Sequence, residues 1–134
     1  MGIPFIRDMS NFLTLKLFHM IWFLAVLKKY AIFEGRARRK EYWYFGLFSF
    51  LFTFLFAFLS AFFNNLSLYY IFVLSIIIPS IAVGVRRMHD VNKSGWYILI
   101  PIYNLILYCT PGTEGPNQYG PDPKRPEFEE FLNA

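Results

Sequence analysis

Residues 42–63 decide the fold, because they read YWYFGLFSFLFTFLFAFLSAFF and contain no charge. As an α-helix, these 22 residues would be roughly 33 Å long, which is enough to cross the hydrocarbon core of a bilayer. Phenylalanine at every second position from 48 to 58 could also suggest a strand. The residues between them form no polar face, however, and an isolated strand would leave its backbone groups unpaired in lipid. The sequence therefore predicts a membrane-spanning helix.

The composition of the whole chain is also that of a membrane protein. Of its 134 residues, 56% are hydrophobic, 22% are aromatic and only 16% are charged. About a quarter of the residues of an average soluble domain are charged. A single cysteine, Cys109, excludes a disulfide-stabilised secreted scaffold. His19 and His89 are far apart in the sequence and have no second histidine–carboxylate set beside them, so we expect neither a metal nor a cofactor.

A second uncharged run, residues 66–85, follows the first almost directly. Only Asn64 and Asn65 separate the two runs, so they must form a tight antiparallel hairpin. Pro79 lies inside the second run, where it removes one backbone donor and frees a carbonyl group. A helix in a bundle tolerates such a proline because its neighbours can satisfy the freed carbonyl.

Two further apolar stretches are less regular. Residues 96–110 are short for a span and contain Pro101, so they are either a third span or a broken, partly re-entrant segment; we expect a span. Residues 11–27 are interrupted by Lys16 and His19, and a charge at mid-membrane costs about 2.5–3.5 kcal/mol on insertion scales. An amphipathic helix in the membrane interface avoids that cost.

The predicted fold class is an all-α integral membrane protein. It has an N-terminal amphipathic interfacial helix, a three-span helical bundle and a Pro/Gly-rich C-terminal tail. We divide the chain into an N-terminal extension (1–19), a single membrane domain (20–123) and a polar tail (124–134). The spans are expected at about 42–63, 66–85 and 96–110. Eight of the residues 111–126 are proline or glycine, which excludes a helix and favours an ordered loop anchored by Tyr119 over an extended partner-binding strip.

Basic residues lie before the first predicted span and after the second, whereas the turn between the spans has none. The positive-inside rule then places both basic loops on the cytoplasmic side of the membrane. Such loops attract anionic lipids, so we expect membrane lipids rather than nucleic acid as partners. The basic residues are Lys28, Lys29, Arg36, Arg38, Arg39, Lys40, Arg86, Arg87 and Lys93.

Small side chains share one side of the first predicted span and let another helix approach closely. So small a bundle buries little surface, so association with a second copy or with an unidentified membrane protein is plausible. This packing stripe consists of Gly46, Ser49, Thr53, Ala57, Ser60 and Ala61.

The most prominent polar feature is a cluster expected at the cytoplasmic ends of the first two spans. In one interpretation its charges neutralise one another as a structural cap. In the other, its guanidinium groups hold a lipid phosphate and a histidine–aspartate pair moves a proton. The interface cluster is Arg38, Glu41, Arg86, His89 and Asp90. The head-group candidates are Arg36, Arg38, Arg39, Arg86 and Arg87.

Three motifs in order resemble a known family. They are GRARRKEYW (35–43), RRMHDVNKSGW (86–96) and PGTEGPNQYGPDP (111–123). Their order and wording are similar to the bacterial inner-membrane family called domain of unknown function 805, and the resemblance runs from about Trp22 to Pro123. Family members begin near Met20 and usually have leucine where Met88 stands. The resemblance implies a small multi-span inner-membrane protein and no particular activity.

Three functional hypotheses follow, and we assign no catalytic residue. The favoured one is a non-enzymatic envelope protein that interacts with a lipid or a protein partner, because no recognisable catalytic constellation is present. The first alternative is a lipid-phosphate enzyme that uses Arg86, Arg87, His89 and Asp90. The second is a subunit of an oligomeric transporter or channel.

Overall fold

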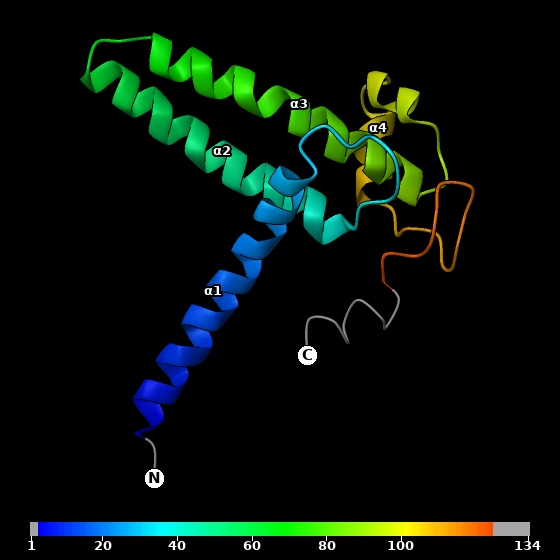
Figure 1. The fold of residues 1–134 in the computed structure, drawn as a ribbon, viewed down its shortest axis with the longest axis horizontal. Helices are drawn as coiled ribbons and strands as arrows, with labels where there is room; N and C mark the ends of the chain where they lie inside the picture. Colours follow the sequence, from blue (N-terminus) through cyan, green and yellow to red (C-terminus); the bar gives the residue numbers. More distant parts are fainter. Residues whose placement is uncertain (1–2, 125–134) are drawn as a thin grey trace.

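A computed structural model describes residues 3–124, and this part of the chain is helical without a β-sheet (Figure 1). Three helices are long and two helical segments are short. The elements are α1 (Pro4–Lys28), α2 (Arg39–Phe62), α3 (Ser67–Asp90), the 3-10 helix η1 (Gly95–Leu99) and α4 (Tyr103–Cys109). The long helices α1, α2 and α3 are each long and apolar enough to cross a membrane. The acidic end of the predicted polar tail lies outside the described residues.

Helices α2 and α3 form the expected antiparallel hairpin and run side by side in Figure 1. The turn is closed by two hydrogen bonds between the same two residues. The Asn65 backbone N–H donates to the Ser60 carbonyl at 2.9 Å, and the Ser60 hydroxyl donates to the Asn65 carbonyl at 2.6 Å. Asn64 adopts a positive φ of 49°, a conformation that asparagine tolerates better than most residues. The short polar turn therefore reverses the chain within a few residues.

Helix α3 passes through Pro79 without a break. Proline has no N–H to donate to the carbonyl four residues earlier, which belongs to Ser75. The Tyr30 hydroxyl, from the segment after α1, donates to this carbonyl at 2.5 Å. A side chain from a neighbouring segment thus replaces the missing intrahelical bond, as the bundle argument anticipates.

Phenylalanine side chains cover the outside of the hairpin. Phe54 and Phe58 are 63% and 67% exposed, far more than a soluble protein of this size would leave open. On the opposite side of α2, Phe56 stacks on Phe72 of α3 with ring centroids 4.4 Å apart. Apolar side chains thus form both the contact between the helices and the surface around them, which is the arrangement of a hairpin surrounded by lipid.

Residues 96–110 do not form the single continuous helix that a third span would require. Residues 96–110 form the 3-10 helix η1 and the seven-residue helix α4, with Pro101 between them. Ile102 has a φ of 67°, which no continuous helix allows. A seven-residue helix is only about 10 Å long and cannot cross the hydrocarbon core. The alternative of a broken segment describes these residues better.

Helix α1 is longer than the predicted 11–27 segment and continues through Met20 without interruption. The structure does not confirm that this helix is amphipathic. In Figure 1, α1 leads away from the hairpin and meets it only near its C-terminal end. There Phe23 stacks on Phe45 of α2 at a centroid distance of 5.4 Å. Almost all of α1 before Trp22 is exposed.

The buried core lies where the C-terminal ends of α1 and α3 meet the N-terminal end of α2. One apolar cluster contains Val26, Ala37, Phe45 and Val83. A second contains Met88, Val91, Leu107 and Tyr108 and attaches the short helices to α3. The contact of α3 with the short helices is close at one glycine: a Cβ at Gly84 would lie 2.7 Å from the Cδ1 atom of Ile98. The core therefore gathers at one end of the hairpin, the end that carries the polar cluster.

Candidate functional site

Five ionised side chains form a buried charge cluster at this end. Arg36 comes from the loop before α2, Glu41 from the first turn of α2, and Arg86, Arg87 and Asp90 from the last turns of α3. None of these side chains is more than 7% exposed. Charges are placed at such depth only when they are paired, because an isolated buried ion costs several kcal/mol.

The pairing within the charge cluster is specific. Arg86 Nη1 lies 2.6 Å from Glu41 Oε1 and joins α3 to α2. Asp90 uses both carboxylate oxygens: Oδ2 accepts from Arg87 Nη1 at 2.5 Å, and Oδ1 accepts from Arg36 Nε at 3.0 Å. The cluster thus ties the loop before α2 and both helices of the hairpin together.

The segment after α4 is held to the charge cluster by hydrogen bonds. The Arg36 guanidinium donates to the carbonyls of Gly115 at 2.7 Å and Thr113 at 2.5 Å, and Arg87 donates to the carbonyl of Thr110. The Thr113 backbone N–H donates in turn to the Asp90 carbonyl at 2.8 Å. A Cβ at Gly112 would lie only 2.1 Å from Asp90 Oδ2, so the loop approaches the carboxylate as closely as glycine allows.

His89 is occupied by structural contacts. Its Nδ1 donates to the Gly35 carbonyl at 3.0 Å, and its ring stacks on Tyr119 with centroids 4.0 Å apart and planes 4° apart. The Asn117 amide donates to the His89 carbonyl at 2.9 Å. The side chain therefore bridges the loop before α2 and the loop after α4.

Asp122 stabilises the loop after α4 through two hydrogen bonds. Its carboxylate accepts from the backbone N–H groups of Lys124 and Gly115, both at 2.9 Å. These hydrogen bonds, that of Lys124 first, favour the ionised form and lower the pKa of Asp122 below its ordinary value of 3.8.

The predicted interface cluster is brought together only in part. Glu41, Arg86, His89 and Asp90 meet at one end of the hairpin, whereas Arg38 makes contacts that lead to a carbonyl and an aromatic ring. It donates to the Pro123 carbonyl at 2.8 Å, and its guanidinium lies 5.7 Å from the Trp22 ring centroid. The residues that neutralise Asp90 are Arg36 and Arg87.

Sequence reasoning missed these two partners of Asp90 for different reasons. Arg36 lies in a loop, where no helical periodicity indicates which way a side chain points. Arg87 precedes Asp90 by three residues on the same helix, a spacing that brings side chains together, so a signal was available.

The charge cluster contains one more cation than anions, since three guanidinium groups face two carboxylates. Within residues 3–124, Arg86 Nε and Nη2 and Arg87 Nε have no hydrogen-bond partner. The same part of the chain gathers no group of three potential metal ligands. The end of the hairpin is therefore electropositive even after its internal pairs are formed.

Of the five head-group candidates, Arg38 is half-buried and the other four separate into two kinds. Arg36, Arg86 and Arg87 are buried among protein acceptors. Arg39 is exposed and, within residues 3–124, makes a single hydrogen bond, from Nη1 to the Cys109 carbonyl at 3.2 Å. Arg39 and its exposed neighbour Lys40 border a basic recess of about 440 Å³. The recess is also lined by Trp43, Tyr44 and Cys109.

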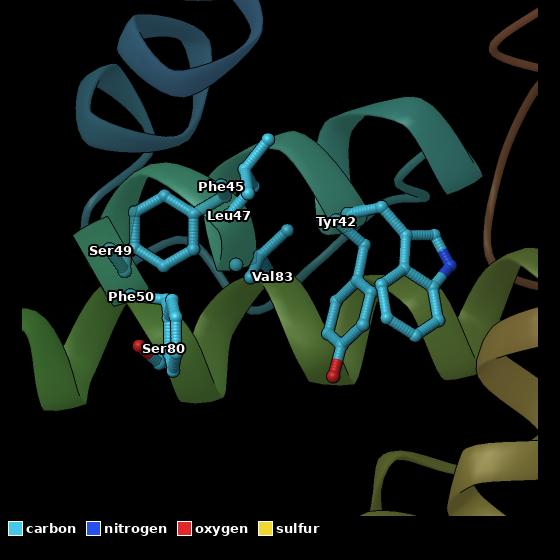
Figure 2. Close-up of a pocket in the computed structure, with 9 residues that line it drawn as sticks. Tyr42, Phe45, Leu47, Ser49, Phe50, Ser80 and Val83 are labelled. Atoms are coloured by element: carbon cyan, nitrogen blue, oxygen red, sulfur yellow. The ribbon is translucent and has the colours of Figure 1, made fainter.

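A second, apolar groove of about 460 Å³ lies between α2 and α3 (Figure 2). Figure 2 shows Phe45 and Ser49 of α2 above Ser80 and Val83 of α3. Ser49 is only 8% exposed, yet its hydroxyl has no hydrogen-bond partner in the described part of the chain. The remaining lining residues are Tyr42, Trp43, Gly46, Leu47 and Phe50.

Only one edge of the predicted packing stripe is buried against a neighbouring helix. Ser49 and Ser60 are buried and Thr53 is half-buried, so this edge lies toward α3. The other edge is exposed and consists of Gly46, Ala57 and Ala61. A Cβ placed on Gly46 would meet no atom within 4 Å, so the stripe leaves open space beside the groove.

The fold and this site define a small helical membrane protein whose hairpin ends in a buried charge cluster. Comparison with known sequences then gives the family: residues 30–121 match the profile of the protein family of unknown function DUF805, and the chain belongs to this family. The resemblance of the three motifs is thereby confirmed.

Two inner membrane proteins of Escherichia coli (strain K12) are similar to the chain. YhaI is 40% identical over 115 residues, which cover 78% of this chain and 97% of YhaI. YhaH is 40% identical over 118 residues, which cover 78% of this chain and 98% of YhaH. Together with the three long apolar helices, these relatives support an inner-membrane protein. No solved structure matches the chain.

Proposed function

We propose that this protein is a non-enzymatic inner-membrane protein that binds anionic phospholipids at its cytoplasmic face. The observation that carries the proposal is the recess in which Arg39 and Lys40 lie beside Trp43 and Tyr44. Exposed cations near a bilayer surface each contribute about 1 kcal/mol of attraction to acidic head groups. Tryptophan and tyrosine favour the same depth of the membrane.

The distribution of charge supports this role. Lys28 and Lys29 are exposed at the end of α1, and Arg39 and Lys40 are exposed at the start of α2. The carboxylate of Glu41, which could neutralise them, is buried and paired with an arginine. The positive-inside rule assigns both basic loops to the cytoplasm, where the leaflet carries acidic lipids.

The direction of α1 supports an interfacial position for this helix. If the α2–α3 hairpin crosses the bilayer, α1 leads away from it along the surface (Figure 1). Lys16 would then remain near water, which avoids the cost of a charge at mid-membrane. Length and composition alone would also allow α1 to cross, so its depth must be measured.

The lipid-phosphate enzyme is the weaker candidate. Its residues Arg86, Arg87, His89 and Asp90 hydrogen-bond to protein groups, and Asp90 is 1% exposed. A general acid or base must reach the reacting group within hydrogen-bond distance. These contacts favour the structural interpretation of the cluster. No observation favours a transporter or channel subunit.

Native mass spectrometry of the protein extracted with its own lipids tests the proposal. We expect wild type to retain more acidic phospholipid than the bulk membrane contains, and Arg39→Gln/Lys40→Gln to lose this enrichment. Arg7→Gln/Lys16→Gln removes two charges from the distant part of α1 and is the matched control. Wild-type lipids in the proportions of the bulk membrane would overturn the proposal. A second protein retained at fixed stoichiometry, without lipid enrichment, would instead support a partner-binding role.

A further inference from the structure

We propose that one phospholipid with an acidic head group binds along the first three turns of α2. Its head group occupies the basic recess at Arg39 and Lys40, and one acyl chain enters the apolar groove between α2 and α3. This inference rests on the proposed function and assigns it a specific site. The lipid is held at the protein surface and remains accessible from the bilayer.

The two recesses adjoin each other. Trp43 lines both the basic recess and the apolar groove, so one side chain forms part of each wall. Arg39, Trp43, Gly46 and Phe50 follow one another at spacings of four, three and four residues, which places them on one face of α2. A ligand that lies along this face contacts cationic side chains at one end and apolar side chains at the other.

The apolar groove has room for a hydrocarbon chain. Its volume of about 460 Å³ is in the range of small-molecule sites, and its walls are mainly aliphatic and aromatic side chains. Gly46 leaves the groove open on the side that faces the bilayer, because no atom lies within 4 Å of the place a Cβ would take. The Ser49 hydroxyl in this wall is buried and has no hydrogen-bond partner within the described residues.

Charge complementarity identifies the other end of the ligand. The only ionised residues that line the basic recess, within the described residues 3–124, are Arg39 and Lys40. Arg39 has several N–H groups left after its single bond to the Cys109 carbonyl. Guanidinium and ammonium groups side by side suit a head group with a net negative charge better than a zwitterionic one, whose phosphate is already balanced by its own cation. An amphiphile with a phosphate at one end and hydrocarbon at the other matches both recesses, whereas free phosphate uses only one.

The test measures binding of phosphatidylglycerol to the detergent-solubilised full chain by titration in native mass spectrometry. Gly46→Leu places a side chain in the groove without a backbone clash, and we expect it to weaken binding by roughly tenfold or more, as the loss of a buried hydrocarbon contact should. Arg39→Gln should weaken binding through the lost charge. Ala57→Leu adds the same side chain further along the exposed edge of α2, outside the groove, and should bind like wild type.

Ser80→Leu narrows the groove from α3 and replaces Gly46→Leu if that variant does not fold, as judged by its thermal unfolding. Wild-type binding by both groove variants, with binding still lost in Arg39→Gln, would overturn the groove assignment and leave the proposed function intact. Equal competition by glycerol phosphate and by phosphatidylglycerol would also overturn it, because the head group alone would then suffice. Equal binding of phosphatidylglycerol and phosphatidylcholine by wild type would overturn both proposals.

Discussion

At the scale of single residues, the stability of the hairpin end depends on ionic pairs that water does not reach. Arg86 and Glu41 are 1% and 7% exposed at their side chains, so the pair is shielded from solvent. Removing one partner of such a pair leaves an uncompensated charge, whereas removing both does not. Comparing the single with the double substitution therefore separates two free energies. One is the cost of an unpaired buried charge, and the other is the contribution of the ion pair to stability.

We expect Glu41→Gln to destabilise the protein by about 3–5 kcal/mol, because it leaves the Arg86 guanidinium buried without a counter-charge. Glu41→Leu/Arg86→Leu should recover a large part of this loss. Thermal unfolding in detergent measures both effects, and Glu34→Gln, at an exposed position, is the control. A double variant less stable than Glu41→Gln would contradict the expectation.

Gly112→Ala should loosen the loop from the charge cluster. Its Cβ would lie 2.1 Å from Asp90 Oδ2, so the loop or the carboxylate must move, at a cost of about 1–3 kcal/mol. Gly46→Ala, where the new atom meets nothing and alanine is the better helix former, should not lower the unfolding temperature of the protein. Equal unfolding temperatures for the two variants would show that the loop does not approach Asp90 in solution.

The pH dependence of the loop should follow Asp122. Its pKa is lowered in the folded protein, so its contribution to loop stability is present above the ordinary value of 3.8 and is lost as the pH falls through the lowered pKa. Hydrogen exchange of the Gly115 amide, which donates to this carboxylate, should therefore accelerate relative to the unfolded chain in acid. In Asp122→Asn this acceleration should disappear, and its persistence would assign the effect to another group.

The identity of the buried residues could be predicted in part from the sequence. Helical spacing and the hairpin placed Glu41, Arg86 and Asp90 at one end of the molecule. The role of Arg36 could not be predicted, because its contacts to Thr113 and Gly115 depend on two loops whose paths no local periodicity fixes.

At the scale of elements, helix α3 depends on a side chain outside it. The Tyr30 hydroxyl satisfies the Ser75 carbonyl that Pro79 leaves without a helical donor. We expect Tyr30→Phe to lower the free energy of unfolding by about 0.6–1 kcal/mol, the usual contribution of a hydrogen bond between membrane helices. Thermal unfolding in detergent provides the measurement.

A double-mutant cycle with Pro79→Ala controls that experiment. Alanine restores the backbone N–H, so the Ser75 carbonyl regains its helical partner. Tyr30→Phe should then cost less in the Pro79→Ala background than in wild type. Equal costs in both backgrounds would show that the hydroxyl acts through some other contact.

The helices also show which parts of the fold a sequence pattern can predict and which it cannot. Two uncharged runs with a two-residue turn between them leave few alternatives to a hairpin. Residues 96–110 had the right composition for a span, but Pro101 and the positive φ of Ile102 divide them into η1 and α4. Composition does not report a break in the backbone, so the number of spans could not be fixed from hydropathy alone.

At the scale of the whole molecule, the position of α1 decides the topology. Spin labels at Phe5, Leu13 and Leu24 on a Cys109→Ser background report the depth of each residue in reconstituted bilayers. A helix along the interface should give three similar, shallow depths, whereas a spanning helix would place Leu13 deepest. The label at Phe54, in the middle of α2, supplies the reference for a residue deep in the hydrocarbon.

The hydrogen bonds between the charge cluster and the loop after α4 also impose an order on biosynthesis. A ribosome delivers Arg36 and Asp90 well before Thr113 and Gly115, which complete their surroundings. Until that last segment emerges, the newly inserted hairpin carries guanidinium groups whose final acceptors do not yet exist. Closure of the hairpin end therefore waits for the loop after α4, and a chain truncated before Thr113 would keep an open, positively charged end.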